Sequence, residues 1–163
     1  MRQICAHSSR NRLLSVGVSC AKVMIQSYQI NFQKSIELQR KYPTYSMPKC
    51  CYENVYRLIM NTREFQRQGF GLHEKFIAFG YVKKPDLPLA YRHAFLIEGN
   101  QVLDTTLAER DCIYYVAERF CFTEYLHRII KSAYYDLHND QELKQKEQVL
   151  YKALLEEEIY CCG

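Results

Sequence analysis

The segment YRHAFLIEGNQVLDTT, residues 91–106, constrains the fold more than any other part of this chain. Two runs rich in β-branched and aromatic residues flank the tetrapeptide EGNQ. Gly-Asn suits a two-residue hairpin turn, because glycine readily adopts the positive φ that such a turn requires. The segment therefore predicts a β-hairpin with Ile97 opposite Val102. A three-residue loop is the alternative, and it would shift the strand register by one residue.

The two-residue loop gathers polar and apolar side chains on one face of the hairpin. That face carries His93, Phe95, Ile97, Val102, Asp104 and Thr106. His93 and Asp104 are diagonal neighbours on it, so their side chains can meet. The apolar neighbours predict that this face is buried, where a histidine–carboxylate pair would lie in a partly dry setting. With the three-residue loop, these two side chains would point to opposite faces.

A second constraint is the segment KCCYENVYRLI, residues 49–59, in which two cysteines precede a helical pattern. Pro43 and Pro48 end the preceding element, and a helix is predicted from about Cys51 to Arg63. Its apolar stripe has the i, i+4, i+7 and i+8 spacing of an amphipathic helix. The stripe consists of Cys51, Val55, Leu58 and Ile59.

A cysteine at a helix start can become reactive. The free N–H groups and the positive end of the helix dipole stabilise a thiolate and lower the thiol pKa. Cys51 lies on the apolar stripe, whereas Cys50 aligns with Asn54, so Cys51 is the favoured nucleophile and Cys50 the alternative. If this helix packs on the face that carries His93, the sulfur of Cys51 can approach the imidazole. Cys51, His93 and Asp104 would then form a nucleophile, a base and an orienting carboxylate.

The motifs CYEN at 51–54, HAF at 93–95 and VLDTT at 102–106 resemble those of the papain-like and transglutaminase-like thiol enzymes, including their small bacterial and phage members. The resemblance implies that Cys51 is the nucleophile, His93 the general base and acid, and Asp104 the orienting group. It also implies an α+β fold in which the nucleophile helix packs on an antiparallel β-sheet, here with additional N- and C-terminal helices.

The chain departs from this family pattern at three points. Phe95 stands where tryptophan is frequent, no proline follows Asp104, and no glutamine lies shortly before Cys51 to act as the second oxyanion donor. Tyr45 and Asn54 are the stand-ins for that donor. These departures leave the substrate class open and make an inactive relative an alternative. The resemblance covers about residues 50–106, a third of the chain.

The rest of the chain supplies five further elements. We expect one long helix over 19–41, strands over 75–84 and 112–120, a helix over 122–137 with Thr123 as N-cap, and a charged helix over 140–160. Residues 1–17 are Arg- and Ser-rich and acid-poor, which indicates a flexible arm or a targeting segment. Residues 18–163 would form a single cysteine-hydrolase-like domain.

The composition of the chain argues against several kinds of site and partner. The eight cysteines include no C-x-x-C pair, which argues against a zinc finger, and no segment is apolar over enough residues to span a membrane. We therefore expect free thiols in a reducing cytoplasm, with neither a metal nor an organic cofactor. The net charge of +4 is modest, so nucleic acid is not an expected partner.

The sequence thus predicts a thiol-dependent hydrolase or acyltransferase that acts on an amide, ester or thioester carbonyl. A peptide, a protein or a small amide would be the substrate, and the oligomeric state and the acyl acceptor stay open. One alternative is a catalytically inactive, protein-binding member of the same fold. Another is a nucleic-acid-binding module that uses the basic N-terminal arm.

Overall fold

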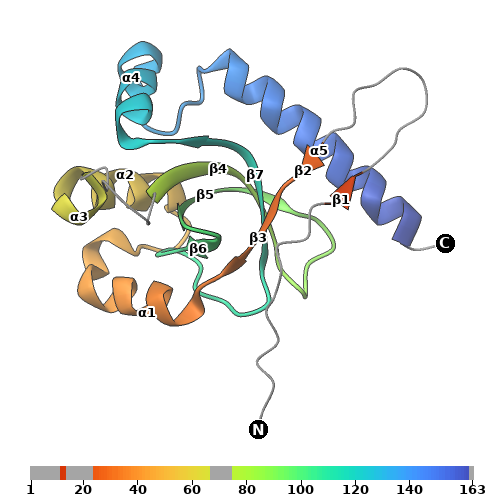
Figure 1. Ribbon diagram of the computed structural model, residues 1–163, viewed down its shortest axis with the longest axis horizontal. Coiled ribbons are helices and arrows are strands. Elements are labelled where there is room, and N and C mark those ends of the chain that lie inside the picture. Colours follow the sequence, from red (N-terminus) through yellow and green to blue (C-terminus); the bar gives the residue numbers. More distant parts are fainter. Residues whose placement is uncertain (1–11, 14–23, 67–74, 162–163) are drawn as a thin grey trace, which may run out of the picture.

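The computed structural model describes residues 12–13, 24–66 and 75–161 of the chain, which adopt a mixed α+β fold (Figure 1). The strands are β1 (Arg12–Leu13), β2 (Met24–Ile25), β3 (Ser27–Ile30), β4 (Lys75–Lys83), β5 (Tyr91–Glu98), β6 (Gln101–Leu103) and β7 (Ile113–Phe120). The helices are α1 (Phe32–Lys41), the 3₁₀ helix η1 (Pro43–Tyr45), α2 (Cys51–Asn61), α3 (Arg63–Gln66), α4 (Phe122–Ser132) and α5 (Gln141–Cys161). The strands predicted over 75–84 and 112–120 are confirmed as β4 and β7. Apart from β1, which pairs with β2, the predicted arm lies outside the described residues.

Five strands form a closed barrel in the order β3-β6-β5-β4-β7. β3 closes it by pairing parallel with β6 on one side and antiparallel with β7 on the other. The β4–β7 ladder shifts register between Phe79 and Gly80. A Cβ at Gly80 would lie 2.0 Å from the carbonyl oxygen of Tyr115, so only glycine allows the two strands to approach so closely.

The prediction of one long helix over 19–41 is wrong in its first half. Residues 24–30 form β2 and β3, and the helix begins only at Phe32. Tyr28 and Ile30, two residues apart, both point into the barrel, as alternate residues of a strand do. The strand is stabilised by pairing with β6 and β7, which are distant in the sequence, so the local spacing did not reveal it. Asn31 then starts α1, because its side chain accepts a hydrogen bond from the amide of Lys34 at 3.0 Å.

The predicted hairpin is confirmed with its two-residue loop. Ile97 pairs with Val102 in the β5–β6 ladder, and Gly99 has a φ of 59°. The ladder ends where Leu96 faces Leu103, so Asp104 lies just beyond the strand rather than within it.

The two faces of this hairpin serve different parts of the core. One face points into the barrel, where Phe95, Ile97 and Val102 pack with residues of the other strands. The opposite face carries Ala94, Leu96 and Leu103, and α2 packs on it. The condition considered from the sequence, that this helix packs on the face with His93, is not met, because closure of the barrel fills that face with side chains from the other strands. In Figure 1, α2 lies with α1 and α3 on one side of the barrel, and α5 lies on the other.

Helix α4 begins one residue before the predicted N-cap. Cys121 is the N-cap residue, and its amide donates to the Glu124 carboxylate at 2.8 Å in a capping box, in place of the predicted cap at Thr123. The helix ends at Ser132 instead of 137, because Ala133 adopts a left-handed conformation with a φ of 62°.

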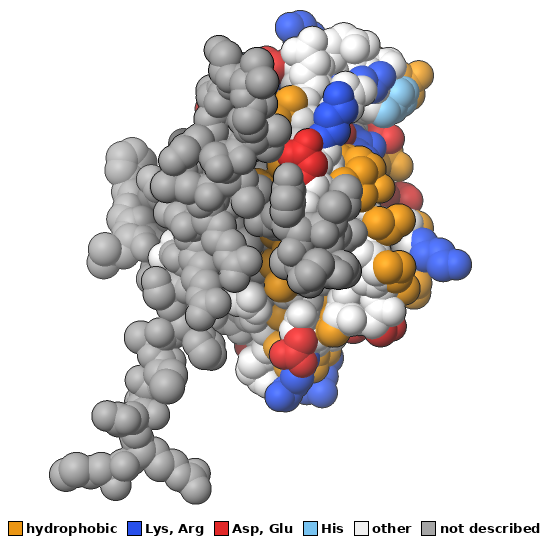
Figure 2. All heavy atoms as spheres, turned by 90° about the vertical axis from the view of Figure 1, so that its right-hand side faces the viewer, with side chains coloured by type: hydrophobic (Ala, Val, Ile, Leu, Met, Phe, Trp, Pro, Cys, Tyr) orange, Lys and Arg blue, Asp and Glu red, His pale blue; other side chains and the backbone are white. Residues whose placement is uncertain are grey.

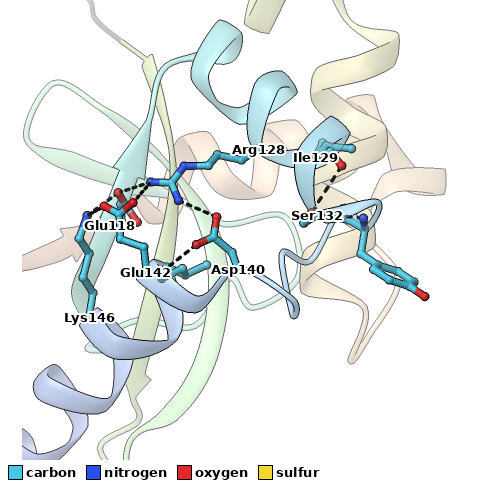
Figure 3. Close-up of polar contacts among 9 residues, drawn as sticks. Glu118, Arg128, Ile129, Ser132, Asp140, Glu142 and Lys146 are labelled. Carbon is cyan, nitrogen blue, oxygen red and sulfur yellow. Dashed lines mark hydrogen bonds and ion pairs between the residues drawn. The ribbon is translucent and has the colours of Figure 1, made fainter.

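An ion-pair network fixes α4 and α5 to β7 (Figure 3). Arg128 of α4 pairs with Glu118 of β7, with Asp140 at the start of α5 and with Glu142 of α5, at 3.2, 2.6 and 3.1 Å. Lys146 adds a second bond to Glu118 at 2.6 Å. Because Glu118 is mostly buried, these two cations compensate the charge of its carboxylate. Among the described residues, no helix has the length and apolar character needed to cross a membrane.

Candidate functional site

The site is built around the start of α2. Lys49 has a φ of 64°, and this left-handed residue turns the chain into Cys50, the N-cap residue. No side chain among the described residues caps the first turn of α2, so its N–H groups remain available to an anion. Cys51 is the first helical residue and is 9% exposed.

His93 and Asp104 meet as the hairpin predicts. Nε2 of His93 lies 2.7 Å from Oδ2 of Asp104, and the two side chains are 4% and 1% exposed. The ring stacks on Phe95 at a centroid distance of 6.2 Å, which fixes its plane inside the barrel. Because Nε2 faces the carboxylate, Nδ1 is the ring nitrogen left for a thiol.

The Asp104 carboxylate is held from both sides. Its Oδ1 accepts hydrogen bonds from the amides of Thr106 and Leu107 at 2.8 and 2.9 Å, a local turn that ends the hairpin. Its Oδ2 accepts from the hydroxyl of Tyr114 at 2.9 Å as well as facing His93. These hydrogen bonds fix the position of the carboxylate beside His93.

The thiol and the imidazole shift each other's pKa. Burial favours the neutral thiol, but the hydrogen bond and the charge of His93, with a further hydrogen bond from the backbone of Ala94, lower the pKa of Cys51 overall. Burial likewise opposes protonation of His93, but the charge of Asp104, its hydrogen bond and that of Cys51 raise the pKa of His93. A lowered thiol pKa beside a raised imidazole pKa favours a thiolate–imidazolium pair.

The structure thus brings the three predicted residues Cys51, His93 and Asp104 together. Cys50, the alternative nucleophile, is a half-buried free cysteine at the N-cap of α2. Adjacent residues on a helix point in different directions, so only one of the two sulfurs can face the imidazole.

Asn54, a stand-in for the second oxyanion donor, has a different role. Its side chain is fully buried; Oδ1 accepts from the Met47 amide at 3.1 Å, and Nδ2 donates to the Met47 carbonyl at 2.7 Å. The other hydrogen of Nδ2 goes to Oγ1 of Thr106 at 2.8 Å. Both amide hydrogens are used, so Asn54 has none for a substrate oxygen. It instead ties the loop before the nucleophile to the turn that holds Asp104.

Sequence reasoning missed two tyrosines at this site. Tyr114 reaches Asp104 from β7, and the ring of Tyr91 packs edge-on against His93 at a centroid distance of 6.1 Å. Tyr91 precedes His93 by two residues and therefore shares its face, a signal that the hairpin pattern already contained. No comparable signal pointed to Tyr114, since its contact depends on closure of the barrel.

The described residues contain no cluster of three or more His, Cys, Asp or Glu side chains arranged to hold a metal ion. On the side of the molecule shown in Figure 2, the described surface interleaves basic, acidic and apolar side chains. A protein that binds a nucleic-acid backbone usually presents a continuous basic surface instead of such a mixture. The basic N-terminal arm on which that alternative depends lies outside the described residues, except for β1.

Comparison of the chain with family models, with curated proteins and with solved structures finds no significant match. A function for this chain is therefore inferred from the geometry of the site.

Proposed function

We propose that this chain is a thiol-dependent hydrolase or acyltransferase with a papain-like or transglutaminase-like core. Cys51 is the nucleophile, His93 the general base and acid, and Asp104 the orienting group. The observation that carries the proposal is the 2.7 Å contact between Nε2 of His93 and Asp104, which leaves Nδ1 for the Cys51 thiol. Helix α2, which begins at Cys51, packs against β5 of the antiparallel strands β4, β5 and β6. This arrangement is similar to the nucleophile helix on an antiparallel sheet that the family resemblance implies.

In the first half of the reaction, the Cys51 thiolate attacks a carbonyl carbon and a C–S bond forms. The carbon–heteroatom bond to the leaving group then breaks, and His93 gives its Nδ1 proton to the departing amine, alcohol or thiol. The role of Asp104 is to hold the ring in orientation and to stabilise the imidazolium. The product is a thioester between the acyl group and Cys51.

In the second half, water or an amine attacks the thioester. His93, now neutral, takes a proton from the attacking group, the C–S bond breaks, and the thiolate–imidazolium pair is restored. Attack by water completes a hydrolysis, and attack by an amine completes a transfer. In both halves the uncapped N–H groups at the start of α2 can stabilise the oxyanion of the tetrahedral intermediate.

One observation favours an inactive, protein-binding relative as the second candidate. Cys51 is only 9% exposed, so little of this residue is accessible to a substrate carbonyl. The two candidates differ in whether Cys51 can form a covalent acyl intermediate.

The test is acylation by p-nitrophenyl acetate, an activated ester that makes few demands on a binding site. We expect a burst of p-nitrophenol and an acetyl group on the peptide that contains Cys50 and Cys51, found by mass spectrometry. Cys51→Ala should abolish both. Cys50→Ala is the matched control and should retain both, because Cys50 lies outside the proposed triad.

Acetylation that persists in Cys51→Ala would contradict the proposed nucleophile. A folded wild-type protein that is not acetylated at all would favour the inactive relative.

A further inference from the structure

Tyr114 contacts the carboxylate of the proposed triad from the opposite side of the barrel. It lies on β7, is fully buried, and packs edge-on against Phe95 at a centroid distance of 5.0 Å. Its hydroxyl is 2.9 Å from Oδ2 of Asp104 and 3.1 Å from the carbonyl oxygen of Leu107.

A phenol has one hydrogen, so Tyr114 can donate to only one of these oxygens at a time. The carboxylate is the stronger acceptor because it is charged. Oδ2 of Asp104 then receives two hydrogen bonds, one from Tyr114 and one from Nε2 of His93. The phenol itself stays protonated, because burial and the adjacent carboxylate raise the pKa of Tyr114.

We propose that Tyr114 is a positioning residue that limits the basicity of the Asp104–His93 pair through its hydrogen bond to Oδ2. A donor on the carboxylate withdraws negative charge from the oxygen that faces the imidazole. The imidazolium is then stabilised less, so His93 can release its proton more easily. The catalytic importance of this effect rests on the proposed function, since only an acid–base reaction requires His93 to return the proton.

Other titratable groups also act on this cluster. Cys51 of α2 acts on His93, and Tyr91 of β5 and Cys112, next to β7, act on Tyr114. Cys51 is the group that changes charge together with His93, and its hydrogen bond and charge raise the pKa of His93. Removing this thiol therefore lowers the titration midpoint of His93 and isolates the contribution of Asp104 and Tyr114. Further out, Glu109 and Lys84 act on Cys112.

The experiment is an NMR titration of His93 in ¹³C-histidine-labelled Cys51→Ala protein. In this background, Tyr114→Phe removes the donor but keeps the ring, and we expect the midpoint of His93 to rise by about one pH unit, a tenfold change in proton affinity. The matched control is Tyr28→Phe. Tyr28 packs in the same barrel interior, but its hydroxyl interacts with Arg119, so the midpoint should not move.

An unchanged or lowered midpoint in Tyr114→Phe would overturn the inference, as would an equal rise in Tyr28→Phe. If Tyr114→Phe does not fold, 3-fluorotyrosine at position 114 gives the test with nearly the same shape. Its more acidic hydroxyl is a stronger donor, so the midpoint should fall, and a midpoint that does not fall overturns the inference. Neither measurement involves acylation of Cys51, so a failure here is distinct from a failure of the proposed function.

Discussion

Replacing Asn54 with alanine tests whether the nucleophile loop and the Asp104 turn are held together by one buried amide. Asn54 makes three hydrogen bonds, two to the backbone of Met47 and one to Thr106, and is fully buried. At about 1 kcal/mol for each bond, the variant should lose about 3 kcal/mol of the free energy of unfolding. For a chain of this size, that loss corresponds to a fall in Tm of about 6–12 °C.

The assay is urea unfolding followed by circular dichroism, with a thermal scan of the same samples. Asn61→Ala is the matched control, because Asn61 lies on the same helix but is exposed and makes a single bond to the Arg57 carbonyl at 2.8 Å. It should change the free energy of unfolding by less than about 0.5 kcal/mol. A loss below about 1 kcal/mol in Asn54→Ala, or a loss equal to that of Asn61→Ala, would show that the buried Asn54 amide does not hold the loop and the turn together.

Three further changes probe other parts of the structure. Asp104→Asn removes the charge that raises the pKa of His93, so acetylation by p-nitrophenyl acetate should slow by about 10²-fold or more; a rate within threefold of wild type would contradict the orienting role. Arg128→Met leaves the buried carboxylate of Glu118 with only one cation, and urea unfolding should show a loss of about 2 kcal/mol; no loss would mean that the network in Figure 3 does not stabilise the fold. Gly80→Ala places a Cβ 2.0 Å from a carbonyl oxygen of β7 and should lower the Tm by more than 6 °C, whereas an unchanged Tm would show that the strands can separate at little cost.

Local patterns in the sequence predicted those parts of the site that depend on neighbouring residues. The Gly99 turn set the register that brings His93 and Asp104 together, since register follows directly from the length of the loop. The apolar stripe of α2 likewise identified Cys51 as the cysteine that faces the core.

Features that depend on long-range pairing could not be predicted in this way. Residues 27–30 have a spacing that fits either a helix or a strand, and only pairing with β6 and β7 decides in favour of β3. Because the barrel is closed, the hairpin face with His93 lies inside it and α2 packs on the opposite face. Closure also places Tyr114 of β7 within hydrogen-bond distance of Asp104. These contacts join segments that are distant in the sequence, and a single sequence contains no local signal for them.

The thiolate–imidazolium pair of Cys51 and His93 is tested most directly by the pH dependence of alkylation of Cys51 by iodoacetamide, resolved by peptide mapping. We expect an inflection for Cys51 below the ordinary thiol pKa of about 8.5, because reactivity is lost only as pH falls through the lowered pKa of Cys51. In His93→Gln, only the backbone hydrogen bond of Ala94 still opposes the effect of burial, which is the larger of the two, so the Cys51 inflection should move above about 8.5. An inflection at or above 8.5 in the wild-type protein, or one that His93→Gln leaves in place, would contradict the thiolate–imidazolium pair.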